Sequence, residues 1–238
     1  MEKLANLTPA VQQKLEELTK TLESKLGKNL VGVVVHGSAV RGGWRAGASD
    51  VDIVVVLGEA TQQALESIGP ALELARFSAR IEAMLLTRDE ISRSADCFPL
   101  LYGDLARKSV TLSGTNPFKG LDVPAHHKRL RIEQELRELR IRMRRVATDY
   151  TGQANHYAGA VDRKLKQARD PLWSLMTLRG ETIDDTLETV LAACAKAYSL
   201  DLSPLKRVRE DAKAAFDTLG TLFDKALHDV DSREGGSA

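Results

Sequence analysis

Apolar positions in the first half of the chain follow two patterns, a helical period and short valine-rich runs. Between residues 9 and 26 they recur every three or four positions, which predicts an amphipathic helix that begins at Thr8-Pro9. The runs 30–35 and 51–57 predict two buried strands, because β-branched side chains favour a pleated surface. The other predicted elements are a turn of helix or a loop over 38–42, a helix over 61–78 that bends or breaks at Gly69-Pro70, a strand over 80–87, helices over 88–94 and 98–108, and a short strand over 110–112.

The pattern changes after the segment SGTNPFKGLDVP, Ser113–Pro124, which holds two glycines and two prolines and is typical of a domain boundary. No strand-like run follows it. The sequence therefore predicts an α+β domain over 1–124, an all-α helical bundle over 125–230 and a disordered tail over 231–238. The bundle is expected to hold about five helices, with breaks near Thr151-Gly152, Asp170-Pro171, Gly180 and Ser203-Pro204.

Composition narrows the class of protein. Over 238 residues, 43% hydrophobic and 28% charged side chains are typical of a soluble globular chain. A formal net charge of +1 gives no global field that attracts nucleic acid or a membrane. There is no run of about 18 apolar residues and no apolar core of a signal peptide. Cys97 and Cys194 lie far apart without metal-like spacing, so we expect no disulfide framework and a location in the reducing cytoplasm.

Candidate chemistry is concentrated between the two valine-rich runs. Asp50 and Asp52 are one residue apart where the second run begins, and alternate residues of a strand point to one face. Two carboxylates a few ångströms apart repel each other unless a cation lies between them. Mg²⁺ prefers oxygen ligands and binds one or two protein carboxylates together with substrate phosphates. Asp50 and Asp52 therefore indicate a site for one or two Mg²⁺ ions, suited to phosphoryl or nucleotidyl transfer.

The residues before this pair favour phosphate binding. Gly37 follows the first strand and allows the backbone to approach a ligand closely. The Ser38 hydroxyl and the N–H groups of the following helical turn are expected to hold a phosphate. Arg41, one helical turn further on, is a candidate for the same phosphates, although an exposed loop arginine is an equally good interpretation.

The segment HGSAVRGGWRAGASDVDIVVVL resembles the signature of the polymerase-β-like nucleotidyltransferase superfamily: a strand, Gly-Ser, a spacer, Asp-x-Asp and a second strand. Within it, HGSA…GG…SDVD is most similar to the aminoglycoside nucleotidyltransferases, especially the streptomycin/spectinomycin adenylyltransferases. The resemblance implies a nucleotidyltransferase fold, with a mixed sheet and flanking helices. It also implies an Mg²⁺-dependent enzyme of antibiotic resistance, which transfers AMP from ATP to a hydroxyl of a small acceptor, such as an aminoglycoside-like antibiotic, and releases pyrophosphate.

The family's third acidic residue is matched by Glu82 in the predicted strand 80–87. An unpaired carboxylate buried among the apolar residues of that strand would cost on the order of several kcal/mol, so its presence there indicates a functional role. The resemblance implies that Glu82 is either a third acid on the metal side or the base that accepts the proton of the acceptor hydroxyl, and the base is the closer match. The alternative is a surface position on an edge strand.

Other features have a structural interpretation beside a functional one. His36 is expected to be a hydrogen-bonded residue at a strand end, and Asp104 a structural acid. The run His126–Arg145 holds eight Lys/Arg and three Glu, which suits nucleic acid. Its apolar residues recur at helical spacing, however, so we favour a solvated amphipathic helix with an i,i+4 pair between Glu138 and Arg142. Three aromatic residues of the helical half are expected in its core: Tyr157, Trp173 and Tyr198.

Two other functions remain open at this point. A nucleotidyltransferase of the toxin–antitoxin type would modify a protein or an RNA end, and the basic helix would then bind that acceptor. A nucleotide-binding regulator would keep the fold without turnover. The complete set of acidic residues argues against the regulator.

Overall fold

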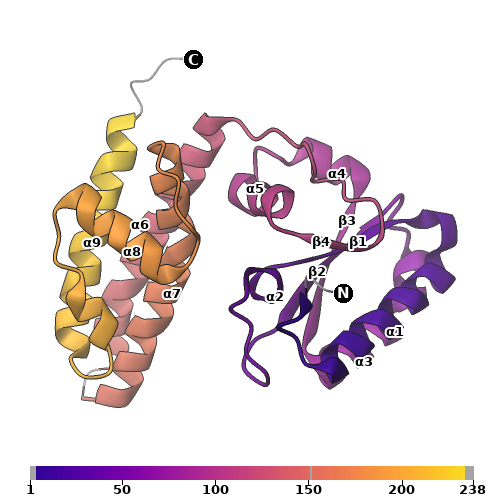
Figure 1. The fold of residues 1–238 in the computed structure, drawn as a ribbon, viewed down its shortest axis with the longest axis horizontal. Helices are drawn as coiled ribbons and strands as arrows, with labels where there is room; N and C mark the ends of the chain where they lie inside the picture. The colour runs from indigo at the N-terminus through magenta and orange to yellow at the C-terminus, as the bar shows by residue number, and fades with distance from the viewer. Residues whose placement is uncertain (1–3, 151, 234–238) are drawn as a thin grey trace. The chain divides into compact units, whose positions relative to one another are not determined.

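A computed structural model of the protein describes residues 4–150 and 152–233. The chain divides into two compact units, residues 1–123 and 124–238, which we describe one at a time (Figure 1). The division lies within one residue of the end of the Gly- and Pro-containing segment 113–124.

The first unit is built on a mixed sheet of four strands in the order β3-β2-β1-β4. β1 pairs antiparallel with both β2 and β4, whereas β2 and β3 are parallel, so the expected mixed sheet is confirmed. The two central strands are the valine-rich runs of the sequence. The strands are β1 Leu30–His36, β2 Val51–Leu57, β3 Ile81–Thr87 and β4 Val110–Gly114.

Helices cover both faces of this sheet (Figure 1). In β2, Val55 packs on the face that α1 and α3 cover, whereas Val54 and Val56 pack on the other face, against α4 and α5. Asp52 shares the parity of Val54, so it belongs to the face of α4 and α5. The helices are α1 Pro9–Leu26, the single turn α2 Ser38–Arg41, α3 Gln62–Ala79, α4 Arg88–Arg93 and α5 Pro99–Arg107.

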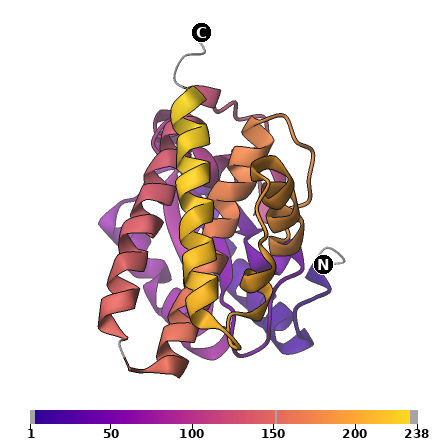
Figure 2. The ribbon, with the colours of Figure 1, turned by 90° about the vertical axis from the view of Figure 1, so that its left-hand side faces the viewer.

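The second unit is an all-α bundle. Its long helices pack on one another, and Figure 2 shows α9 running beside α6. The buried side chains of α6 are the apolar residues that recur at helical spacing in the sequence: Ile132, Leu136, Leu139, Met143 and Val146. The helices are α6 Ala125–Asp149, α7 Ala154–Leu178, α8 Leu187–Tyr198 and α9 Ala212–Ser232, with a 3₁₀ turn, η3, at Ser203–Arg207.

Two possible helix breaks at prolines are absent, because packing outweighs the local effect of proline. α3 runs through Pro70, and α7 runs through Pro171, so the predicted break at Asp170-Pro171 is wrong. A proline inside a helix removes one backbone hydrogen bond. In α7 the buried Leu172 and Leu175 lie directly after Pro171 and hold the helix against the bundle.

The C-terminal end differs from the prediction. α9 continues to Ser232, so the start of the expected tail over 231–238 is helical. Residues 234–238 of that tail lie outside the described residues. Both cysteines are free thiols, Cys97 exposed and Cys194 buried. Over 4–150 and 152–233, no helix is long and apolar enough to cross a membrane.

We expect Leu136→Ala to lower the free energy of unfolding by about 2–5 kcal/mol, because it leaves a cavity in the bundle where Leu136 is fully buried. Leu130→Ala, on the same helix, is the matched control, because Leu130 is 47% exposed and its truncation should cost no more than about 0.5 kcal/mol. Urea denaturation of the full chain measures both values. Equal effects would contradict the assignment of the buried face of α6.

Candidate active site

The register of the sheet brings three titratable side chains into one row. His36 lies opposite Asp52 across the antiparallel pair β1–β2, and Asp52 lies beside Glu82 across the parallel pair β2–β3. Cross-strand neighbours share a face of the sheet, here the face of α4 and α5. Asp50 comes two residues before Asp52 and so lies on the same side where β2 begins. The expected acids therefore meet at one end of the sheet.

Strand pairing places Glu82 in this row, although its side chain is not buried. β3 is an edge strand, and the Glu82 side chain is 47% exposed and pairs with Arg76, whose Nε lies 3.1 Å from Oε1. The premise of a costly buried carboxylate is therefore wrong, because water solvates this acid. Its place in the site follows from the parallel register, which sets it beside Asp52.

Asp50 is paired with Arg80, whose Nη2 lies 2.7 Å from Oδ1. Arg80 ends α3 in a left-handed conformation with φ of 54°, and its carbonyl oxygen accepts a 2.9 Å hydrogen bond from the Val51 N–H. The same residue thus fixes the start of β2 and supplies a positive charge to the first carboxylate. Both side chains are about half exposed, so water screens the ion pair.

Asp52 is the more perturbed carboxylate. Burial raises its pKa, Asp50 and Glu82 raise it further, and His36 and Arg41 oppose the shift. Burial also lowers the pKa of His36, against the effects of Asp52 and Asp104. A divalent cation between Asp50 and Asp52 would remove the repulsion and favour the ionised form of Asp52. The donor set therefore fits a hard ion such as Mg²⁺ that takes its remaining ligands from phosphates and water.

The protein donors for such an ion are few. No cluster of three or more His, Cys, Asp or Glu residues forms a metal site in the part of the chain that the structure describes. Two carboxylates are enough for Mg²⁺ at a phosphate site, where the substrate supplies other oxygens.

The turn above Asp52 requires glycine. Gly37 has φ of 70°, and a Cβ at this position would lie 2.5 Å from Oδ2 of Asp52. Its carbonyl oxygen accepts from the N–H groups of Val40 and Arg41 at 3.2 and 3.1 Å, which closes the single turn α2. The turn that begins at Ser38 therefore starts directly against the carboxylate of Asp52, as a phosphate-binding role needs.

Arg41 is not the exposed loop arginine of the alternative interpretation. Its side chain is only 15% exposed, and Nη1 lies 3.2 Å from Oδ2 of Asp104 on α5. Arg107 contacts the other oxygen of Asp104, with Nη2 3.0 Å from Oδ1. Asp104 is thus linked to a predicted nucleotide-binding residue, a contact between positions 63 residues apart that no local sequence signal indicates.

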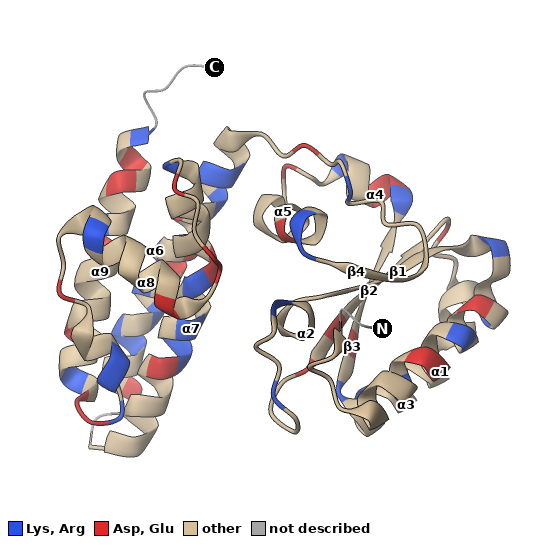
Figure 3. Ribbon diagram, viewed as in Figure 1, with Lys and Arg blue, Asp and Glu red and all other residues tan. Residues whose placement is uncertain are grey.

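The basic run of α6 is largely neutralised within its own unit. Figure 3 shows acidic and basic residues interspersed over these helices. The predicted pair of Glu138 with Arg142 is confirmed. This pattern favours the solvated amphipathic helix over a nucleic-acid surface. Further ion pairs of α6 include Arg129–Glu133, Arg131–Glu135, Arg137–Glu133, Arg137–Asp231, Arg140–Asp224 and Arg145–Asp149.

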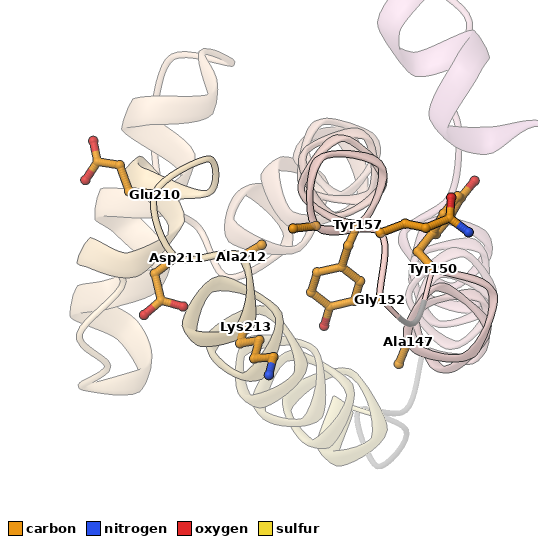
Figure 4. A pocket seen from close by; sticks show the side chains of 10 residues that line it. Ala147, Tyr150, Gly152, Tyr157, Glu210, Asp211, Ala212 and Lys213 are labelled. Atoms are coloured by element: carbon orange, nitrogen blue, oxygen red, sulfur yellow. The ribbon is translucent and has the colours of Figure 1, made fainter.

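The second unit has a cavity of its own, about 510 Å³ in volume, between the α6–α7 turn and the start of α9 (Figure 4). Tyr157, expected in the core, is half-buried there and packs against Phe216, with ring centroids 5.8 Å apart. The charged residues of its wall, Glu210, Asp211 and Lys213, are all exposed. The cavity is therefore open to water, and it contains none of the predicted site residues.

The mixed sheet, the glycine turn and the acidic row are the features that the resemblance to nucleotidyltransferases predicts. The family model described as "Nucleotidyltransferase domain" matches residues 15–140, more than half of the chain and all of the predicted site residues. The protein therefore belongs to the nucleotidyltransferase domain family and is an enzyme of that class. No curated protein sequence is a significant match to the chain.

Among solved structures, the chain is similar to spectinomycin adenyltransferase AAD(9) from Enterococcus faecialis, in a structure with ATP and spectinomycin. The TM-score is 0.51 at 16% sequence identity, over 92% of this chain and 99% of the other. At this identity the similarity concerns the fold. It confirms a nucleotidyltransferase fold followed by an all-α region.

We expect Gly37→Ala to destabilise the protein more than Gly42→Ala. Gly42 has left-handed φ and ψ of 86° and 2°, which cost an alanine about 1–2 kcal/mol, and a Cβ there has no atom within 4 Å. Gly37 has φ of 70° and ψ of −147°, a conformation almost restricted to glycine, so an alanine is more strained there. Only Gly37→Ala adds the clash with the Asp52 carboxylate. Thermal unfolding of the two variants measures the difference, and equal melting temperatures would contradict the close packing of Gly37 on Asp52.

The raised pKa of Asp52 predicts that Asp52→Asn increases the stability of the folded protein in a pH-dependent way. A folded-state pKa above the unfolded value near 3.8 contributes stability only at low pH, and that contribution is lost as the pH rises through the folded pKa. Asp52→Asn should therefore be more stable than the wild type at pH 7.5, with the difference shrinking towards pH 4. Denaturant unfolding in metal-free buffer across this range provides the measurement, with the exposed Asp122→Asn as control. A variant less stable than the wild type at pH 7.5 would exclude this account of Asp52.

Proposed function

We propose that this protein is an Mg²⁺-dependent adenylyltransferase that transfers AMP from ATP to a hydroxyl of a small acceptor, such as an aminoglycoside-like antibiotic, and releases pyrophosphate. The observation that carries the proposal is the meeting of Asp50, Asp52 and Glu82 on one face, at the sheet end where Gly37 covers Asp52. Family membership gives the reaction class. The choice of ATP and of a small acceptor is supported by the similar enzyme whose structure holds ATP and spectinomycin. We expect the reaction to take place in the cytoplasm.

Asp50 and Asp52 would hold the metal. Their carboxylates are adjacent and belong to one side of the sheet, and the pKa of Asp52 is raised by burial and by Asp50, so a cation is the missing favourable partner. When bound, Mg²⁺ neutralises the charge of the phosphates during transfer.

Gly37, Ser38 and Arg41 would hold the β- and γ-phosphates. The backbone at Gly37 lies close to Asp52, so a triphosphate bound there lies beside the metal-holding carboxylates. The Ser38 hydroxyl is half-buried at the start of α2 and can donate a hydrogen bond to a phosphate oxygen. Arg41 adds a positive charge at the end of the same turn.

Glu82 would be the general base. The oxygen of the acceptor hydroxyl bonds to the α-phosphorus, the bond from that phosphorus to the bridging oxygen breaks, and pyrophosphate leaves with the electron pair. The hydroxyl proton passes to the carboxylate of Glu82. Because Glu82 is about half exposed at the sheet edge, an acceptor arriving from solvent can reach it.

The alternative acceptors receive less support. An RNA end would need free basic side chains, whereas most arginines of α6 pair with acids of their own unit. A small acceptor needs no such surface.

The test is to incubate the protein with Mg²⁺ and ATP labelled on the α-phosphate, in the presence of spectinomycin, streptomycin, RNA or protein. Label in the antibiotic supports the proposal, and label in RNA or protein, or in none of them, overturns it.

For the base, we expect Glu82→Gln to lower kcat about 10²–10⁴-fold while the affinity for Mg²⁺ and ATP stays within about twofold. The amide keeps the size of the side chain and one acceptor oxygen but cannot accept the proton. Steady-state kinetics and isothermal titration calorimetry give the two values. Glu59→Gln, a change of an exposed glutamate outside the site, is the control. A parallel loss of ATP affinity would instead assign Glu82 to the metal.

A further inference from the structure

We infer that Asp104 is a positioning residue of the transfer site. Its carboxylate holds Arg41, and through Arg41 it keeps the single turn α2 and the Gly37–Ser38 segment against Asp52. The contact itself is independent of the chemistry, whereas its consequence for the nucleotide rests on the proposed function.

α2 needs an anchor outside itself. It spans only Ser38–Arg41, and a helix this short is not stable on its own, because helix nucleation is unfavourable. Glycines with positive φ flank it on both sides, Gly37 at 70° and Gly42 at 86°. Within the turn only Ala39 is fully buried, and an alanine contributes little apolar area. Tertiary contacts must therefore fix the position of the turn.

The ion pair with Asp104 is such a contact. It joins α2 to α5 across 63 positions of the chain, with Nη1 of Arg41 3.2 Å from Oδ2. The two side chains are 15% and 17% exposed, so water screens them less than the exposed pairs elsewhere in the protein. Breaking a pair at this depth costs more than breaking a surface pair, because a partly desolvated charge remains.

α5 provides a firm base for this tie. Tyr102 and Leu105, on either side of Asp104 in the sequence, are fully buried beneath the sheet. Arg107, one turn along, holds the other oxygen of Asp104 at 3.0 Å. The carboxylate is thus oriented by its own helix and directs its free oxygen to Arg41.

The ion pair between Arg41 and Asp104 lies next to the proposed transfer site. α2 begins two residues after His36, which lies opposite Asp52 in the sheet register, so Arg41 and its partner Asp104 lie at the same sheet end. Gly37, at the other end of α2, packs on Asp52. A shift of α2 therefore changes the spacing between the phosphate-holding turn and the metal-holding carboxylates, on which transfer depends steeply.

This inference excludes a different role, in which Arg41 leaves Asp104 for a phosphate when nucleotide binds. In that case Asp104 competes with the nucleotide, and its removal tightens ATP binding. In a positioning role, removal of Asp104 weakens ATP binding instead.

The test combines a nucleotide-independent readout with kinetics on Asp104→Asn. We expect amide hydrogen exchange at Val40 and Arg41 to rise at least tenfold, with the exchange of β2 unchanged, because those two amides close α2 on Gly37. We expect KM for ATP to rise about tenfold, with a smaller change in kcat. Asp104→Glu should restore KM to within about threefold, and Arg107→Gln, which leaves the Arg41 contact in place, should change it less than Asp104→Asn does.

Unchanged exchange at Val40 and Arg41, or a lower KM for ATP, overturns the inference. If Asp104→Asn does not fold, Arg41→Gln breaks the same tie from the other end and must give the same rise in exchange. If exchange rises while the wild type binds no ATP, the anchoring of α2 stands and the proposed function fails. The two failures are therefore distinguishable.

Discussion

The crowding of the Asp52 carboxylate, between Asp50 and His36 and beneath Gly37, is the constraint on which the site depends. Burial and neighbouring acids raise the pKa of Asp52, so the folded protein holds a carboxylate where its charge is unfavourable. The buried valines of β1 and β2 supply the apolar packing that tolerates it. A site that is costly without a cation and favourable with one is suited to metal-dependent phosphate chemistry.

Around this constraint, each neighbouring element has one physical task. The antiparallel register fixes His36 opposite Asp52, and the parallel register fixes Glu82 beside it. Gly37 allows the chain to turn directly over the carboxylate, and α5 holds the next turn in place through Asp104 and Arg41. Strand pairing thus determines where the acids lie, whereas a glycine and an ion pair determine the position of the proposed phosphate-binding turn.

The sequence predicted the parts of the site that local patterns encode. Alternation in DVDIVVVL, residues 50–57, predicts Asp50 and Asp52 on one face, and the valine runs identify both central strands. It could not decide whether β3 lies at the sheet edge, because periodicity says nothing about strand order, and the structure shows the alternative of an exposed Glu82 on an edge strand. Nor could spacing reveal the contact of Arg41 with Asp104, because the two residues are 63 positions apart and meet only through the fold. Pro171 misled because tertiary packing outweighs a lost hydrogen bond.

The most direct test of the central claim is the Mg²⁺ dependence of ATP binding, measured by calorimetry on the wild type, Asp50→Asn and Asp52→Asn. The account predicts that Mg²⁺ strengthens ATP binding to the wild type. It also predicts that each substitution weakens binding in Mg²⁺ by about 10–100-fold, the equivalent of about 1.5–3 kcal/mol for a lost charged ligand. ATP binding that is indifferent to Mg²⁺, or unchanged in both variants, would contradict the account.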